Sequence, residues 1–264
     1  MVVAAVAALG ITVAPCAASR PSTYINELPH PRMVIHSHPT GNQFTLHEMQ
    51  TALDYGVQAV ELDVHYRDSD KQVVCNHNRS TEESPTLEAA IKLLLSRKAD
   101  SQTVNHDGLQ FFLVLEPKEN SARLFDAIAD VLGRYEKYLS TAVGPADGPR
   151  GITVVITGSY PGQFYSHFRP EAINRLCIAE RHDYASEITC LSTAGTRINW
   201  ISIRHSKTAG DDARRVSELH SKFNVRIWDS HKDLPLALTT GADSLNCDVN
   251  EIEGFKKLLA AQRL

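Results

Sequence analysis

Two carboxylates stand two residues apart in the apolar segment AVELDV, which spans residues 59–64. In an extended strand the side chains alternate between two faces, so Glu61 and Asp63 share one face while Leu62 lies on the other. Neighbouring carboxylates repel each other and resist removal from water unless a cation neutralises them. Ligation by oxygen alone suits magnesium, calcium or manganese. The pair indicates a divalent metal site, although a polar strand face with a salt bridge would carry the same residues.

A second segment adds a third carboxylate and a lysine. Residues 111–115 are almost wholly apolar, as is typical of a parallel strand buried on both faces, and Glu116 and Lys118 follow directly. Glu116 shares strand parity with Phe112, so a regular strand directs both side chains into the same interior. A third carboxylate there would complete a site for a hard cation, Mg²⁺ or Ca²⁺. Lys118 would add a positive charge beside a phosphoryl oxygen bound at that site.

Two histidines follow extended segments on either side of the acidic strand. His36 follows residues 33–35, and His77 follows residues 72–75. Cleavage of a phosphodiester needs a base for the attacking hydroxyl and an acid for the leaving alkoxide. Imidazoles titrate near neutral pH and can do both. We therefore take His36 and His77 as candidate catalytic residues, although a single histidine after a strand is more often a loop or packing residue.

Three further residues stand at the ends of later strand candidates, namely Arg204, Trp228 and Asp248. In an α/β barrel, the carboxyl ends of the strands carry the active site. The three residues are therefore candidates for contact with a substrate head group. Packing or a salt bridge at the barrel mouth explains each of them equally well.

The elements that must position these side chains alternate between strand and helix. Between the first two strand candidates, Thr45 and Glu48 form a capping-box pattern that predicts a helix, and a strand–helix–strand unit requires parallel strands. We predict eight main strands, at residues 33–35, 59–64, 111–115, 152–157, 176–179, 200–203, 225–228 and 244–247, and an extended segment at 72–75. We predict further helices at residues 87–97, 121–138, 163–174, 211–223, 233–239 and 252–264.

No linker rich in proline or glycine and no charge block divides these elements. At 264 residues, one α/β domain folded as a single (β/α)8 TIM barrel is the economical interpretation. An open doubly wound sheet is the alternative, and it would need no pairing between residues 33–35 and residues 244–247.

Composition narrows the choice of partner. The chain has 42% hydrophobic residues, 22% charged residues and a formal net charge of -4, as ordinary soluble domains do. This charge provides no electrostatic footprint for nucleic acid. A small substrate is expected, with no protein partner and at most transient contact with a membrane surface.

Residues 1–18 form a short apolar run followed by small residues, which resembles a signal peptide and its cleavage site. We therefore predict a secreted, periplasmic or extracellular protein whose barrel domain spans residues 19–264. A misplaced start or a buried helix would also explain the run.

Without this segment, four cysteines remain at positions 75, 177, 190 and 247, and two disulfides are allowed. Cys177 and Cys190 are the pair closest in sequence.

The motifs VIHSH, TALDYGVQAVELDV, VVCNH, FFLVLEPK and VRIWDSHKDLPLALTTGADSLNCD resemble, in order and spacing, those of the glycerophosphodiester phosphodiesterases and the wider superfamily of phosphatidylinositol-phospholipase-C-like phosphodiesterases. The resemblance covers roughly residues 33–250 and implies a TIM barrel with a divalent metal. It places Glu61, Asp63 and Glu116 on the metal ligands. It places His36 and His77 on the catalytic histidines, with Lys118 after the third main strand.

The sequence departs from the family pattern near the first histidine and after the second. Ser37 follows His36 where the family usually has arginine, and Gln43 cannot supply the carboxylate of the family's Glu-Asn-Thr element. Only seven residues separate His77 from Pro85, where the family carries a substantial insertion. The resemblance therefore implies a phosphoric diester hydrolase with an open site, acting on a glycerophosphodiester or a phospholipid-type phosphodiester.

Two other functions fit parts of the pattern. His36, His38, His77 and the triplet Asp229-Ser230-His231 could form a multi-metal site of the type in polymerase-and-histidinol-phosphatase-like phosphoesterases or amidohydrolases. That interpretation leaves the three carboxylates without a role. The second alternative is a catalytically inactive barrel that acts as a binding module.

Overall fold

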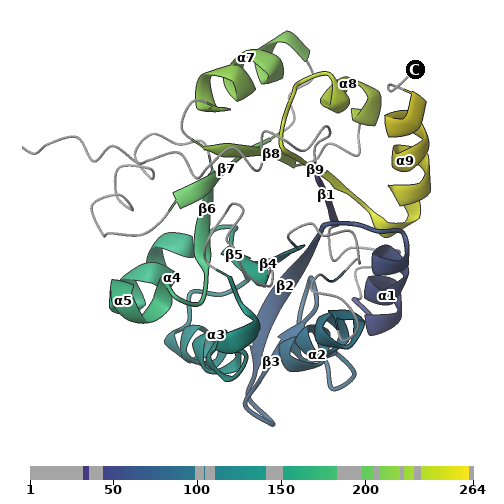
Figure 1. Cartoon of the computed structure of the whole chain (residues 1–264). Coiled ribbons are helices and arrows are strands. Elements are labelled where there is room, and N and C mark those ends of the chain that lie inside the picture. Colours follow the sequence, from purple (N-terminus) through teal and green to yellow (C-terminus); the bar gives the residue numbers. More distant parts are fainter. Residues whose placement is uncertain are drawn as a thin grey trace, which may run out of the picture.

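The fold is an array of parallel strands that curls on itself, with helices outside it (Figure 1). The computed structural model describes residues 32–35, 44–98, 104, 111–140, 151–182, 198–204, 209–220, 223–228 and 233–261. The eight parallel strands are β1 (Arg32–Ile35), β2 (Ala59–Arg67), β4 (Phe111–Pro117), β5 (Ile152–Ile156), β6 (Ile178–His182), β7 (Ile198–Arg204), β8 (Asn224–Trp228) and β9 (Ser244–Cys247). A ninth strand, β3 (Gln72–Cys75), runs antiparallel to β2.

The order of the strands is that of an α/β barrel. From β1 the sheet runs through β9, β8, β7, β6, β5 and β4 to β2, and β1 also pairs with β2. Met33 lies opposite Leu245 of β9, and Val34 lies opposite Ala59 of β2. The pairing of β1 with β9 is the feature that the open doubly wound alternative lacks. The predicted α/β barrel architecture is therefore confirmed.

Helices follow most of the strands and lie outside the sheet in Figure 1. They are α1 (Leu46–Asp54), α2 (Leu87–Lys98), α3 (Ala122–Arg134), α4 (Pro161–His167), α5 (Pro170–Ile173), α7 (Ala209–His220), α8 (Leu234–Leu238) and α9 (Ile252–Ala261), with short 3-10 helices at Glu136–Tyr138 and Val249–Glu251. Thr45 and Glu48 form the predicted capping box before α1. Ser121 caps α3 with a single hydrogen bond, because its hydroxyl accepts from the amide of Leu124.

One predicted helix is wrong in extent. Residues 163–174 do not form one helix, since α4 ends at His167 and α5 begins at Pro170. The proline explains the break: it lacks an amide hydrogen, and it restricts the residue before it, Arg169, which is extended. The predicted strand at 176–179 likewise begins two residues later, at Ile178.

The apolar core has two parts, one on each side of the strands. The larger part lies between the strands and the helices and includes Leu62, Leu113 and Leu132. The smaller part faces the barrel interior and consists of Ala59, Phe112, Val114, Val155, Ile178 and Trp200. Phe112 and Trp200 pack edge to face there, with ring centroids 5.4 Å apart. The inner apolar cluster forms the floor above which the polar side chains lie.

The structure describes three of the four cysteines that could form the two allowed disulfides, and all three are free. Cys177 is free and buried, and its Sγ accepts a hydrogen bond from the Tyr165 hydroxyl at 3.4 Å. Burial raises the pKa of the Cys177 thiol to about 12, so the thiol stays protonated at neutral pH. Cys75 and Cys247 are also free and buried.

Some predictions concern residues beyond those described. The predicted signal peptide at residues 1–18 and the position of Cys190 lie outside the described part of the chain. Within the described part, no helix is both long and apolar enough to cross a membrane.

Candidate active site

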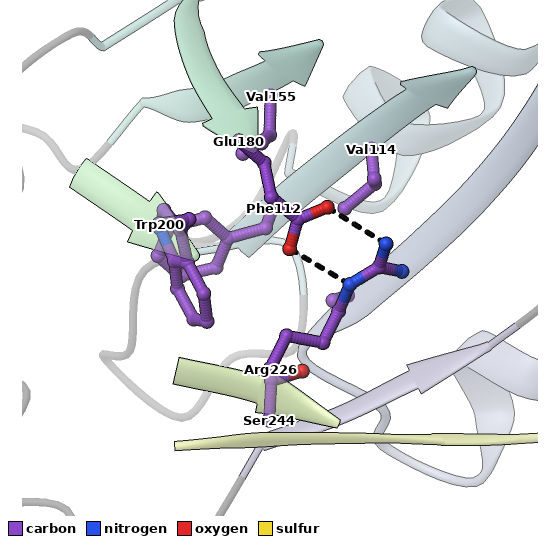
Figure 2. A pocket seen from close by; sticks show the side chains of 8 residues that line it. Phe112, Val114, Val155, Glu180, Trp200, Arg226 and Ser244 are labelled. Carbon is purple, nitrogen blue, oxygen red and sulfur yellow. Dashed lines mark hydrogen bonds and ion pairs between the residues drawn. The ribbon is translucent and has the colours of Figure 1, made fainter. Parts of the chain in front are cut away.

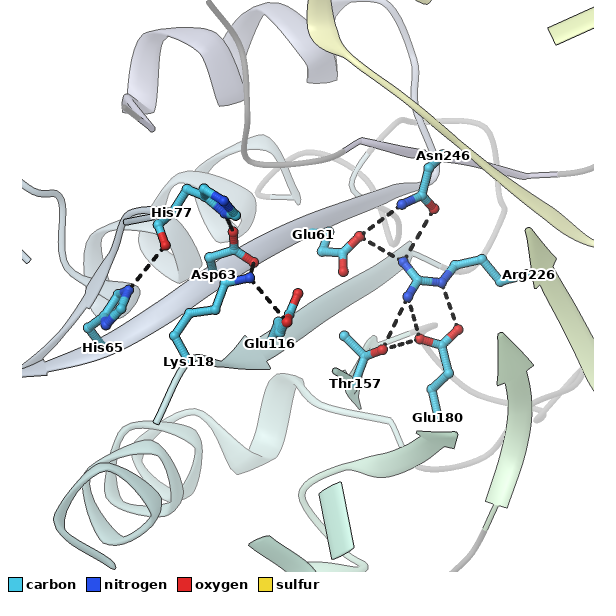
Figure 3. A network of polar contacts seen from close by, with 10 residues as sticks. All are labelled: Glu61, Asp63, His65, His77, Glu116, Lys118, Thr157, Glu180, Arg226 and Asn246. Carbon is cyan, nitrogen blue, oxygen red and sulfur yellow. Dashed lines mark hydrogen bonds and ion pairs between the residues drawn. The ribbon is translucent and has the colours of Figure 1, made fainter. Parts of the chain in front are cut away.

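Four of the predicted residues meet at the carboxyl ends of β2 and β4 (Figure 3). Asp63 lies at the centre: its Oδ2 is 2.5 Å from Nδ1 of His77, and its Oδ1 is 3.3 Å from Nζ of Lys118. The same ammonium lies 3.1 Å from Oε1 of Glu116. Asp63 is 1% exposed, whereas the His77 side chain is 30% exposed. A buried carboxylate thus connects an accessible imidazole to a lysine.

Strand pairing explains how residues distant in sequence converge on Asp63. Asp63 lies directly opposite Glu116 in the parallel pair of β2 and β4, and both residues share parity with the inner apolar cluster. The antiparallel strand β3 returns the chain to the same place, since the amide of Asn76 donates to the Asp63 carbonyl at 2.9 Å. His77 is the next residue, so the β2–β3 hairpin presents its imidazole to the Asp63 carboxylate.

Asn76 fixes the orientation of His77 and was not singled out from the sequence. Its side-chain oxygen accepts from the amide of His77 at 2.8 Å, and its side-chain nitrogen donates to the carbonyl of Arg79 at 2.8 Å. Asn76 is buried, so these bonds are shielded from water. The sequence signal for this role was the asparagine that directly precedes a candidate histidine.

The charges around Asp63 shift its protonation. The pKa of Asp63 is raised to about 8, first by burial and then by the carboxylate of Glu116, although Lys118 lowers it. Burial also lowers the pKa of Lys118, but the carboxylates of Glu116 and Asp63 outweigh this effect and the net shift is upward. Lys118 is therefore charged at neutral pH. Asp63 and His77 are placed to share a proton.

Glu61 lies in a separate, deeper network around Arg226 (Figure 3). Nη1 of Arg226 is 2.7 Å from Oε2 of Glu61, and Nη2 of the same guanidinium is 2.7 Å from Oε2 of Glu180. The guanidinium also donates hydrogen bonds to the side-chain oxygens of Asn246 and Thr157, which complete the network. All five side chains are at most 4% exposed. Burial lowers the pKa of Arg226, but Glu180 and Glu61 outweigh it and raise the pKa.

The sequence analysis missed Arg226 and Glu180, although a signal was present. Each is a charged residue at an inward position of a short apolar strand, as Glu61 is in β2. The same strand-parity argument that selected Glu61 would have selected them. Figure 2 shows the salt bridge between Glu180 and Arg226, which lines a small cavity together with Phe112, Trp200 and Ser244.

The three predicted metal ligands do not form a ready-made coordination sphere. Among the described residues, no three histidine, cysteine or acidic side chains stand close enough to hold a metal ion. Asp63 and Glu116 meet at Lys118, whereas Glu61 is directed towards Arg226. The chemistry of the donors still fits a hard cation, because all three carboxylates belong to inward positions of two adjacent strands. With Glu180 included, four acidic side chains face three basic ones, namely His77, Lys118 and Arg226.

The three predicted substrate contacts lie on β7, on β8 and after β9. Arg204 and Trp228 are opposite each other in register, and the guanidinium carbon lies 5.1 Å from the centroid of the indole ring. Asp248 begins the 3-10 helix Val249–Glu251, and its amide donates to the Glu251 carboxylate at 3.1 Å. Arg204 and Trp228 thus form a cation–π pair, whereas Asp248 is part of a helix start.

Several predicted site residues fall on parts of the chain that the structure leaves undescribed. His36, His38 and Gln43 precede Phe44, where the description resumes after β1, and residues 229–231 fall in the gap after β8. The role of His36 as a catalytic residue and the histidine-rich multi-metal alternative therefore stay predictions.

Neither a protein-family model nor a curated protein matches the sequence. Among solved structures, a glycerophosphodiester phosphodiesterase from Parabacteroides distasonis superposes with a TM-score of 0.61 at 13% identity, over 89% of this chain and 99% of that one. A calcium-dependent phosphoinositol-specific phospholipase C from Pseudomonas sp. superposes with a TM-score of 0.58 at 13% identity, over 86% of this chain and 91% of that one. The chain has the fold of these phosphodiesterases.

Another glycerophosphodiester phosphodiesterase, from Thermotoga maritima, gives a TM-score of 0.51 at 14% identity, over 87% of this chain and 98% of that one. The resemblance expected from the sequence motifs is thus confirmed for the phosphodiesterase fold. At such identities the likeness is one of fold, and the assignment of chemistry depends on the residues at the barrel mouth.

Proposed function

We propose that the chain is a metal-dependent phosphoric diester hydrolase that cleaves a glycerophosphodiester or a phospholipid-type phosphodiester. The observation that carries the proposal is the contact of 2.5 Å between Asp63 and His77, beside the ammonium of Lys118. A carboxylate-bound imidazole is suited to proton transfer, and a nearby cation is suited to a phosphate. The phosphodiesterase fold of the neighbours supports the same class of reaction.

His77 and His36 are the proposed acid and base. The Asp63 carboxyl, in contact with Nδ1, orients the imidazole of His77 and can exchange a proton with it. The partly exposed ring then exchanges a proton with an attacking hydroxyl or with the leaving alcohol. His36, which follows β1 in the sequence, takes the opposite role in the same proposal. Lys118 attracts the phosphate through its positive charge.

Glu61, Asp63 and Glu116 are the proposed ligands of Mg²⁺ or Ca²⁺. A divalent ion at these carboxylates would draw charge from a nonbridging phosphate oxygen. The Pseudomonas neighbour is a calcium-dependent enzyme, which is consistent with the use of a hard cation in this proposal. In this proposal the carboxylates of Asp63 and Glu116 exchange part of their contact with Lys118 for the ion.

The proposal also covers the substrate contacts, the cellular location of the enzyme and the extent of its barrel. The Arg204–Trp228 pair presents a cation and an aromatic face to a head group. Asp248, which directly follows β9, is the third proposed contact. A phospholipid substrate would require transient contact with a membrane surface, and export through residues 1–18 would place the enzyme outside the cytoplasm. Residues 19–264 would then form one (β/α)8 TIM barrel.

Metal re-supply tests the proposal. Chelator-treated protein is given Mg²⁺, Ca²⁺, Mn²⁺ or Zn²⁺ separately, and the hydrolysis of glycerophosphocholine and bis-p-nitrophenyl phosphate is measured together with calorimetric binding of each ion. We expect Mg²⁺ or Ca²⁺ to restore hydrolysis and Glu116→Gln to weaken ion binding at least tenfold. Glu119→Gln is the control, because Glu119 accepts from the amide of Tyr66 instead. Activity that returns only with Zn²⁺ or Mn²⁺ and is unaffected by Glu116→Gln would favour the histidine-rich alternative.

A further inference from the structure

We propose that Gly158, in the turn after β5, is a positioning residue for Glu116. A Cβ atom at position 158 would lie 2.4 Å from Cγ of Glu116 and 2.8 Å from both its Cδ and its Oε1. These distances are far below van der Waals contact. The missing side chain of Gly158 therefore leaves the space that the Glu116 side chain occupies. The functional part of this inference rests on the proposed role of Glu116 as a metal ligand.

Contacts of Thr157 anchor the turn next to Gly158, and they would have to break for the turn to withdraw from Glu116. The amide of Thr157 donates to the carbonyl of Leu115 at 2.9 Å, which ties the turn to β4 one residue before Glu116. Thr157 is 1% exposed, and its hydroxyl contacts both Glu180 and Arg226. Gly158 is thus held between the deep Arg226 network and the mouth of the barrel.

Glu116 is the part that would move if position 158 carried a side chain. Its side chain is 20% exposed, and one of its contacts is the 3.1 Å approach of Oε1 to Nζ of Lys118. Rotation of this side chain costs less than breaking buried backbone hydrogen bonds. A methyl group at position 158 should therefore separate Glu116 from Lys118 and from the carboxylate of Asp63.

Two other glycines show that backbone conformation alone does not explain the requirement. Gly158, Gly56 and Gly241 have φ angles of +84°, +76° and +75°, a region in which residues with side chains are strained. A Cβ at Gly56 or Gly241 would meet no heavy atom within 4 Å. Gly241→Ala therefore introduces the same backbone strain as Gly158→Ala without the contact to Glu116, and serves as its matched control.

Crystal structures of Gly158→Ala and Gly241→Ala test the positioning directly. We expect Oε1 of Glu116 to leave hydrogen-bonding distance of Lys118 in the first variant and to keep it in the second. If Gly158→Ala does not fold, Gly158→Ala/Glu116→Ala should fold, because the contact is removed. A Glu116 side chain that keeps its place while the turn shifts, or a double variant that also fails to fold, would overturn the inference.

Calcium affinity and kinetics test the functional consequence. Calorimetry with calcium alone should show binding at least tenfold weaker in Gly158→Ala than in Gly241→Ala, with no further weakening when Gly158→Ala is added to Glu116→Ala. For hydrolysis, kcat/KM should follow the same non-additive pattern. Additive losses would overturn the link through Glu116. If the unaltered protein neither binds calcium nor hydrolyses a phosphodiester, the proposed function fails, and the crystal comparison still decides the role of Gly158.

Discussion

Arg226 lies between the carboxylates of Glu61 and Glu180, with all three side chains buried. A guanidinium suits this place because its planar fork can contact two carboxylates at once. Removal of one partner from a buried ion pair is strongly destabilising, because the remaining charge stays in a medium of low polarity. Arg226 therefore provides the compensating charge for two buried carboxylates below the mouth of the barrel.

Arg226→Met should lower the free energy of unfolding by about 3–5 kcal/mol, because two buried carboxylates lose this cation. Urea unfolding measures the change. Arg214→Met is the control, since Arg214 pairs with Glu218 on the exposed face of α7, and we expect a loss below about 1 kcal/mol there. The addition of Glu180→Gln to Arg226→Met should recover part of the loss. A loss in Arg226→Met no larger than that of the control would contradict the buried network.

At the scale of residues, the sequence predicted the mouth of the barrel better than its interior. Strand parity selected Asp63 and Glu116, and the structure pairs them across β2 and β4. The partner of Glu61 was not predictable, because Arg226 is 165 positions away and nothing local in either strand specifies the contact. The role of Gly158 was not predictable for a similar reason. The side chain that leaves no room for a Cβ atom at position 158 comes from another strand.

At the scale of elements, Glu88 joins α2 to α3 on the outside of the barrel. Its carboxylate lies 2.9 Å from Nζ of Lys92 and 2.8 Å from Nη2 of Arg134, and it accepts from the Tyr135 hydroxyl at 3.1 Å. These contacts, first that with Lys92, lower the pKa of Glu88 from its ordinary 4.5 to about 2. Because the pKa is lower in the folded state, the stabilisation is present above pH 4.5 and is lost as the pH falls towards 2.

Glu88→Gln should destabilise the protein modestly at pH 7, by less than about 1 kcal/mol, since the contacts are largely exposed. The difference from the unaltered protein should shrink as the pH is lowered through the range from 4.5 to 2. Thermal unfolding at a series of pH values measures it. The control is Glu83→Gln, at an exposed loop position, for which we expect no such trend. A difference that stays constant with pH would contradict the role of Glu88.

The sequence predicted those features of the helices and strands that depend on residues close together in the chain. The capping box of Thr45 and Glu48 identified the start of α1 correctly. The break between α4 and α5 was missed because apolar periodicity continues across Pro170 and hides the interruption. The antiparallel direction of β3 was also not predicted, since an extended segment does not reveal its partner; only the structure pairs Val64 with Cys75.

At the scale of the whole molecule, the barrel interior is arranged in levels. The apolar cluster around Phe112 and Trp200 forms the lowest level, the Arg226 network lies above it, and Asp63 with its partners lies at the mouth. The alternation of strands and helices in the sequence was sufficient to predict this architecture, because parallel strands joined by helices have few ways to bury both faces. Substrate identity depends on side chains at the mouth and did not follow from the alternation.

The central claim is that Asp63 and His77 serve phosphodiester hydrolysis. His167 provides a matched control, because its side chain is also 30% exposed and its Nε2 lies 2.8 Å from the Asp126 carboxylate on the outer surface. The most direct measurement is the initial rate of bis-p-nitrophenyl phosphate hydrolysis, with saturating Ca²⁺ or Mg²⁺, by the unaltered protein, His77→Ala and His167→Ala. We predict that kcat/KM falls about 10²–10⁴-fold in His77→Ala and stays within about twofold in His167→Ala. Equal rates in the two variants would contradict the claim.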